Sequence, residues 1–135
     1  MKHFLFFFLT IFLLSCTNSN QETAPENDLD AARMFIRDAL DGKFKEARQL
    51  MVADSVNDSR MTDTERTYEH MAQDTKRSYR ESSITIYDTR KLNDSTSIVV
   101  YSNTFKNMRD SVKVVRKSGQ WLIDLKYTFE KTLEE

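Results

Sequence analysis

The fold is decided by the stretch from Ser82 to Phe105, which reads SSITIYDTRKLNDSTSIVVYSNTF. Ile84 and Ile86 alternate with more polar neighbours, a pattern that predicts a strand with one buried face. Asn93-Asp94-Ser95 has the composition of a turn. The run Thr96–Phe105 is rich in β-branched residues and apolar on both faces, as expected of a central strand.

The chain after this stretch predicts two more strands. Asn107–Asp110 forms a second turn, and a third strand with Val112 and Val114 leads to a turn at Lys117–Gln120. Alternating apolar residues from Trp121 to Phe129 then predict a fourth strand. Because short turns join antiparallel neighbours, we expect a four-stranded antiparallel meander.

The chain before this stretch is helical in pattern. Apolar residues from Leu29 to Leu40 recur every three or four positions, which indicates a helix with one buried stripe. Asn27 or Asp28 is a suitable N-cap, and Gly42 is a suitable C-cap. A second, short helix follows over residues 44–51, with its apolar side chains on one side.

A third helix is predicted over about Asp63–Tyr79, because Thr62-Asp63-Thr64-Glu65 matches a capping box. The segment Val52–Met61 is polar and is expected to be irregular. No short strand is obvious between the second and third helices. Three helices before an antiparallel sheet predict a single α+β domain over residues 28–135, with the helices on one face of the sheet.

The first residues, Met1 to Cys16, read as a bacterial lipoprotein signal. Lys2 precedes an apolar run of 11 residues, Phe4–Leu14, which is too short to span a bilayer but typical of a cleaved signal. Ser15 stands directly before Cys16, so we expect cleavage of a signal peptide, residues 1–15, and lipid attachment to Cys16. Residues 16–27 are polar after the lipidated cysteine and are expected to form a flexible tether.

The lipid anchor predicts a place in the cell envelope. The residue after Cys16 is Thr17 rather than the aspartate that retains lipoproteins in the inner membrane, which favours the outer membrane. The net charge of −1 gives no basic excess for binding nucleic acid. The membrane is therefore expected to be contacted through the lipid.

The composition also limits the chemistry. The chain has 2 histidines, of which His3 lies in the signal, so His70 is alone and paired-histidine metal sites are excluded. With 2 glycines the chain has no glycine-rich nucleotide loop. Residues 54–65 have the length of a calcium loop, but Val56 at its third position offers no ligand oxygen. We expect no metal site and no cofactor.

Two segments carry a resemblance to a known family. They read ARMFIRDALDGKFKEA from Ala32 to Ala47 and KSGQWLIDL from Lys117 to Leu125. They resemble nuclear transport factor 2-like domains and, more narrowly, a lumazine-binding-like group of unknown function in short bacterial lipoproteins. The resemblance implies a cone-shaped fold with the sheet curved around the helices.

The resemblance also raises an enzymatic alternative. Ketosteroid isomerase-like and polyketide cyclase-like enzymes with this fold use a carboxylate base and a polarising Tyr or Asp inside the cone. The candidates by position are Tyr68, Tyr79, Asp88 and Asp124, although no motif assigns those roles to them. The tyrosines are better explained as core residues and the aspartates as solvated strand positions, so no catalytic residue is predicted.

One predicted face of the sheet is a candidate interaction surface. If the Trp121 side chain fills the end of the core on the helix side, the alternation of side chains along the strands places a mixed apolar and aromatic set on the opposite face. These residues are Val99, Tyr101, Phe105, Val115 and Leu122. Such a face is typical either of a partner site or of an ordinary amphipathic surface. Domains that resemble this one often dimerise through it.

These observations predict a non-catalytic envelope lipoprotein that binds an envelope protein, a second copy of itself or a small ligand. The alternative is an isomerase- or cyclase-like enzyme with a carboxylate in the cone.

Overall fold

The computed structural model describes residues 23–132, so the predicted signal peptide, Cys16 and the first part of the tether lie outside the described residues. Helices precede an open antiparallel sheet with strand order β1-β2-β3-β4, which confirms the predicted α+β meander. The elements are α1 (Asp28–Asp41), α2 (Phe44–Gln49), α3 (Ser55–Glu69), α4 (Gln73–Arg80), β1 (Ile84–Asn93), β2 (Thr96–Asn103), β3 (Arg109–Lys117), β4 (Gln120–Asp124) and α5 (Leu125–Thr132).

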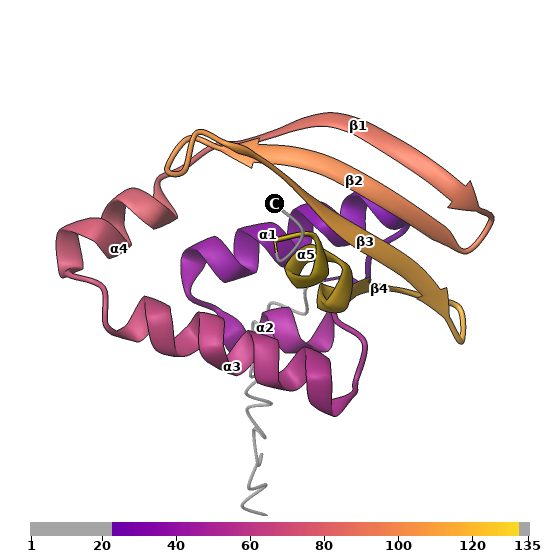
Figure 1. Cartoon of the computed structure of the whole chain (residues 1–135), viewed down its shortest axis with the longest axis horizontal. Helices are drawn as coiled ribbons and strands as arrows, with labels where there is room; N and C mark the ends of the chain where they lie inside the picture. Colours follow the sequence, from indigo (N-terminus) through magenta and orange to yellow (C-terminus); the bar gives the residue numbers. More distant parts are fainter. Residues whose placement is uncertain (1–22, 133–135) are drawn as a thin grey trace, which may run out of the picture.

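The core lies between one face of the sheet and α1. The strands arch over α1, which contacts all four of them, while α2 and α3 lie on the other side of α1 from the sheet (Figure 1). Phe35 and Ile36 of α1 are buried against Val99, Val112 and Ile123 of the sheet. Because apolar burial is the main source of folding free energy, the packing of α1 on the sheet stabilises the fold of the domain.

Both predicted ends of α1 are confirmed. Asn27 is the N-cap, and its side chain accepts a hydrogen bond from the Asp30 N–H at 2.9 Å. Gly42 ends the helix in the left-handed region with φ of 77°. The Lys43 N–H donates to the Asp38 carbonyl at 2.8 Å, which completes a Schellman motif.

From Ser55 onward, the segment Val52–Met61, predicted to be irregular, is instead the start of α3. Asp54 is the N-cap, with its carboxylate accepting from the Asn57 N–H at 2.9 Å, and the helix begins at Ser55. Thr62 and Glu65 are therefore inside the helix, and the capping-box prediction is wrong. Both side chains bind Arg48 of α2, at 3.1 Å and 2.8 Å respectively.

The predicted third helix is two helices. α3 ends at Glu69 with His70 as its C-cap, and α4 begins at Gln73 after a bend. α4 runs toward the end of the sheet where β1 begins (Figure 1), and its Tyr79 packs against the core. The helical periodicity of the sequence continues across this bend and so does not reveal it.

The predicted fourth strand is wrong in its second half. β4 ends at Asp124, and the chain turns into α5 at Leu125. The side chain of Asn57, which is fully buried, accepts a hydrogen bond from the Leu125 N–H at 2.7 Å. That bond from α3 satisfies a backbone group at the start of α5, where the prediction continued the strand.

A short parallel bridge lies between the second and third helices, where the sequence shows no obvious strand. Met51 pairs with Ile123 of β4. The Ile123 N–H donates to the Leu50 carbonyl at 2.8 Å, and the Val52 N–H donates to the Ile123 carbonyl at 2.9 Å. The segment after α2 thus covers part of the free edge of β4.

Candidate functional site

The residues predicted to share one interaction face are divided between two faces of the sheet. Val99 is fully buried in the core beneath α1, and Tyr101 packs against the same core. Val115 and Leu122 pair with each other across β3 and β4 and are half-buried. The prediction of a common face is wrong for Val99 and Tyr101, because Val99 lies opposite Val112 of the core in the observed register.

Phe105 has a separate position, in the turn after β2. Its side chain is 39% exposed and packs edge-on against Tyr79 of α4, with ring centroids 4.8 Å apart. Tyr79 in turn lies 6.0 Å from Tyr68, which lies 5.3 Å from Phe44. These four rings form a continuous row from α2 through α3 and α4 to the sheet.

A pocket of about 300 Å³ lies along this row, and we call it the aromatic pocket. Asp63, Thr67 and Lys106 contribute polar groups to its wall. The Tyr68 hydroxyl accepts from Arg80 at 3.3 Å, and the Lys76 ammonium lies 5.4 Å from the Tyr68 ring centroid. Two cations of α4 therefore contact the Tyr68 ring or its hydroxyl, and Lys76 also donates to the Glu69 carbonyl at the end of α3.

Tyr101 and Asp110 are opposite one another in β2 and β3. Burial raises the pKa of Tyr101 well above its ordinary value, and the Asp110 charge raises it further. Burial and the same carboxylate also raise the pKa of Tyr79. The sequence did not single out Asp110, because its position at the end of a turn indicates a solvated residue.

The two carboxylates considered from the sequence, Asp88 and Asp124, lie outside the aromatic pocket. Asp88 is exposed on β1, and the side chain of Asp124 is 14% exposed. Asp124 accepts from the Asn57 amide at 3.4 Å and lies 3.8 Å from the Lys126 ammonium, so it belongs to the junction between α3 and α5. Neither contributes to the wall of the aromatic pocket.

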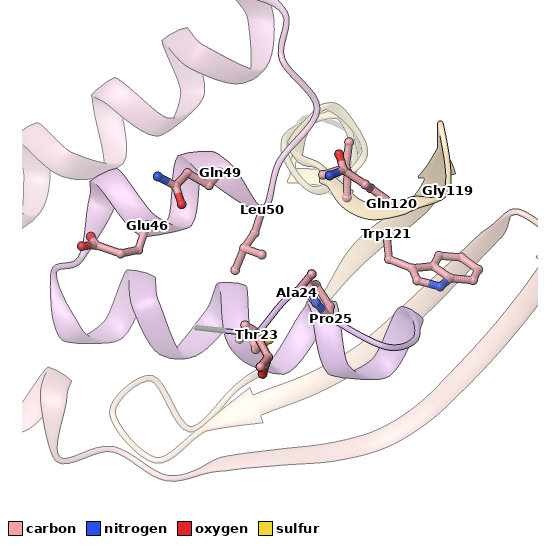
Figure 2. A pocket seen from close by; sticks show the side chains of 11 residues that line it. Thr23, Ala24, Pro25, Glu46, Gln49, Leu50, Gly119, Gln120 and Trp121 are labelled. Carbon is pink, nitrogen blue, oxygen red and sulfur yellow. The ribbon is translucent and has the colours of Figure 1, made fainter. Parts of the chain in front are cut away.

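A second pocket, of about 280 Å³, lies where the chain enters the domain, and we call it the tether pocket. Figure 2 shows Glu46 and Gln49 on one side and Gln120 on the other, with Thr23 near α1. The wall comprises Thr23, Ala24, Pro25, Met34, Glu46, Gln49, Leu50, Gly119, Gln120, Trp121 and Leu122. Apolar side chains with a few amide groups are a typical lining for a binding site.

Trp121 has a mixed environment rather than that of a simple core plug. It is half-buried, packs against the core and contributes to the wall of the tether pocket. The Arg116 guanidinium lies 5.5 Å from its ring centroid. This arrangement suits a cation–π contact at the protein surface.

The residues considered for metal binding are in helices. Ser55–Glu65 is helical throughout, so the segment with calcium-loop length does not form a loop. His70 is exposed, with its Nδ1 2.7 Å from the Arg66 carbonyl oxygen. Within the described residues, no cluster of three or more His, Cys, Asp or Glu side chains is arranged to hold a metal ion.

None of the helices in residues 23–132 has the length and hydrophobicity needed to cross a membrane. No protein-family model matches this chain, and no curated protein matches it.

Proposed function

We propose that this chain is a lipid-anchored lipoprotein of the cell envelope, in the outer membrane, whose α+β domain is a non-catalytic binding module. The tether pocket is the observation that supports this function most directly. Its wall includes Thr23, which is seven positions after Cys16. An extended chain of that length spans at most about 24 Å, so a ligand in the pocket would be held close to the membrane surface.

The chemistry of the tether pocket supports binding. Met34, Leu50 and Leu122 provide apolar contact, while the amides of Gln49 and Gln120 can both donate and accept hydrogen bonds. Glu46 adds one carboxylate at the rim. Such a lining favours an uncharged, partly apolar group with hydrogen-bonding atoms.

The enzymatic alternative requires a carboxylate base near a polarising Tyr or Asp. Asp110 is a candidate base, because its charge raises the pKa of both Tyr79 and Tyr101. The wall of the aromatic pocket contains Tyr79 but neither Tyr101 nor Asp110. A substrate in that pocket would therefore touch one phenol and not the carboxylate, so we prefer binding.

We also propose membership in the nuclear transport factor 2-like family, with which the arrangement of helices on a four-stranded antiparallel sheet is compatible. A second copy would contact Val115, which is half-buried on β3, whereas Leu122 already contributes to the wall of the tether pocket.

The experiment has two arms in bacterial cells that express the full chain. The first compares the mass and membrane fraction of the wild type with those of Cys16→Ala. The proposal predicts a wild type that lacks residues 1–15 and carries a lipid, and a variant that stays uncleaved. Equal masses, after allowance for the substitution, would contradict the anchor.

The second arm introduces a photo-crosslinking residue at Gln120 in the wall of the tether pocket. We expect a discrete adduct with an envelope component that disappears when Gln49 is replaced by Phe, which fills the pocket. Lys45→Phe is the matched control, because Lys45 is exposed on the same helix but outside the pocket wall. An adduct that is insensitive to Gln49→Phe, or the lack of any adduct, would refute binding in this pocket.

A further inference from the structure

The free edge of β4 is only partly covered. Ile123 uses its N–H and C=O to pair with Leu50 and Val52, so these groups point away from β3. Along a strand, alternate residues direct their backbone groups to the same edge. The N–H and C=O of Trp121 therefore point to the same side as those of Ile123, away from β3.

The position of Trp121 at the hairpin agrees with this direction. Ser118 and Gly119 have φ of 48° and 79°, the values of a two-residue turn in which the flanking residues Lys117 and Gln120 pair with each other. The backbone N–H and C=O of Gln120 and Leu122 then point toward β3, and those of Trp121 point away from it. Within the described part of the chain, the outward N–H and C=O of Trp121 have no hydrogen-bond partner.

These two backbone groups belong to a residue in the wall of the tether pocket. Trp121 and Leu50 both contribute to its wall, and the covering segment stops at Leu50 because α2 ends there. A donor and an acceptor on a strand edge, next to an existing parallel bridge, are what an added strand requires. Gln49 and Gln120 flank the edge with further amide groups.

We propose that the tether pocket binds a short extended peptide segment of a partner protein, which pairs with the N–H and C=O of Trp121 and extends the sheet beyond β4. This inference rests on the proposed binding role of the tether pocket and specifies the class of ligand. The uncharged amides and the apolar wall favour a segment with small apolar or hydroxyl side chains. Its main-chain hydrogen bonds would supply affinity, and the pocket wall would select its side chains.

The test uses the full chain purified in detergent, with a displayed library of short random peptides as the probe. Trp121 is the only tryptophan, so its emission reports binding at this edge. We expect selected peptides to bind, and N-methylation of the residue that pairs with Trp121 to weaken them about tenfold, which corresponds to one hydrogen bond. Bound peptide should also slow hydrogen exchange of the Trp121 amide.

Two variants test whether peptides bind at this edge rather than at another surface. Gln49→Phe should abolish peptide binding, and Lys45→Phe on the same helix should retain it. Peptides that tolerate N-methylation at every position, or that leave the Trp121 amide in fast exchange, would overturn the proposal. The proposal would also be overturned if the Trp121 amide exchanged slowly in the free chain and exchanged fast after deletion of residues 17–22. The tether itself would then occupy the edge.

Peptide binding and the Gln120 crosslink together distinguish a wrong ligand class from a wrong binding role. If no peptide binds but the Gln120 crosslink in cells still forms and still depends on Gln49, the pocket binds another class of ligand. If neither peptide nor crosslink is found, the binding role of the pocket is itself wrong.

Discussion

Replacing Gly42 with Ala should destabilise the domain for two reasons that can be measured separately. Gly42 has φ of 77°, where a side chain costs about 1 kcal/mol. A Cβ at this position would also lie 2.7 Å from two ring carbons of Tyr68 and 2.8 Å from its hydroxyl oxygen. The ring would have to shift, which would disturb its contacts with Phe44 and Arg80, and these contribute roughly 1–2 kcal/mol. The total expected loss is about 2–3 kcal/mol.

Gly119→Ala is the matched control. Gly119 has nearly the same φ, 79°, but no atom lies within 4 Å of the position that its Cβ would take. It should therefore lose only the backbone contribution of about 1 kcal/mol. In thermal unfolding followed by circular dichroism, Gly119→Ala should lower Tm by about 4 °C and Gly42→Ala by about 8–12 °C.

A double-mutant cycle isolates the contact with the ring. In a Tyr68→Ala background, the Gly42→Ala change should lose its second contribution and cost only about 1 kcal/mol. Equal falls in Tm for Gly42→Ala and Gly119→Ala would refute the close approach to Tyr68. An unchanged cost of Gly42→Ala in the Tyr68→Ala background would refute it too.

Three further predictions concern stability. Trp121→Ala should lower the free energy of unfolding in urea by about 2 kcal/mol, because Trp121 is half-buried. Truncation of a large, fully buried side chain typically costs about 3–5 kcal/mol, so a loss of about 4 kcal/mol or more would show that Trp121 is a core residue. Asn57→Leu should cost about 2–4 kcal/mol because it removes the acceptor for the Leu125 N–H, and a neutral effect in the same assay would contradict that role. The pKa of Asp54 is lowered from 3.8 to about 2 by the Asn57 N–H and by Lys126, so its stabilisation should be complete above about pH 4 and lost as the pH falls toward 2. Asp54→Asn, which can still cap α3, should flatten the unfolding free energy over that pH range, and an unchanged acid slope would disprove the assignment.

The fold class was predictable because its signals are local. The alternation of Ile84 and Ile86, the turn residues and the glycine at 42 each act over a few residues, and the structure has the predicted meander and the predicted end of α1. The errors arose where distant side chains decide the backbone. Asn57 turns the chain into α5 at Leu125, and no pattern within residues 121–129 records that bond.

The candidate site was less predictable than the fold. Assigning sheet faces from the sequence requires the register between strands, and an error of one residue exchanges the two faces. That error placed Val99 and Tyr101 on the exposed side, whereas both contact the core. The tether pocket combines residues from the tether, α1, α2 and β4, so no single segment of sequence indicates it.

The exchange rate of the Trp121 amide hydrogen shows whether the free edge of β4 binds a partner. It should be measured in the full chain purified in detergent, alone and after addition of solubilised cell envelope, for the wild type and for Gln49→Phe. We expect fast exchange in the free chain, and we expect the envelope to slow this exchange at least about tenfold in the wild type only, as one added hydrogen bond requires. Equal rates with and without envelope, or equal slowing in Gln49→Phe, would contradict the claim that this strand edge is a binding site.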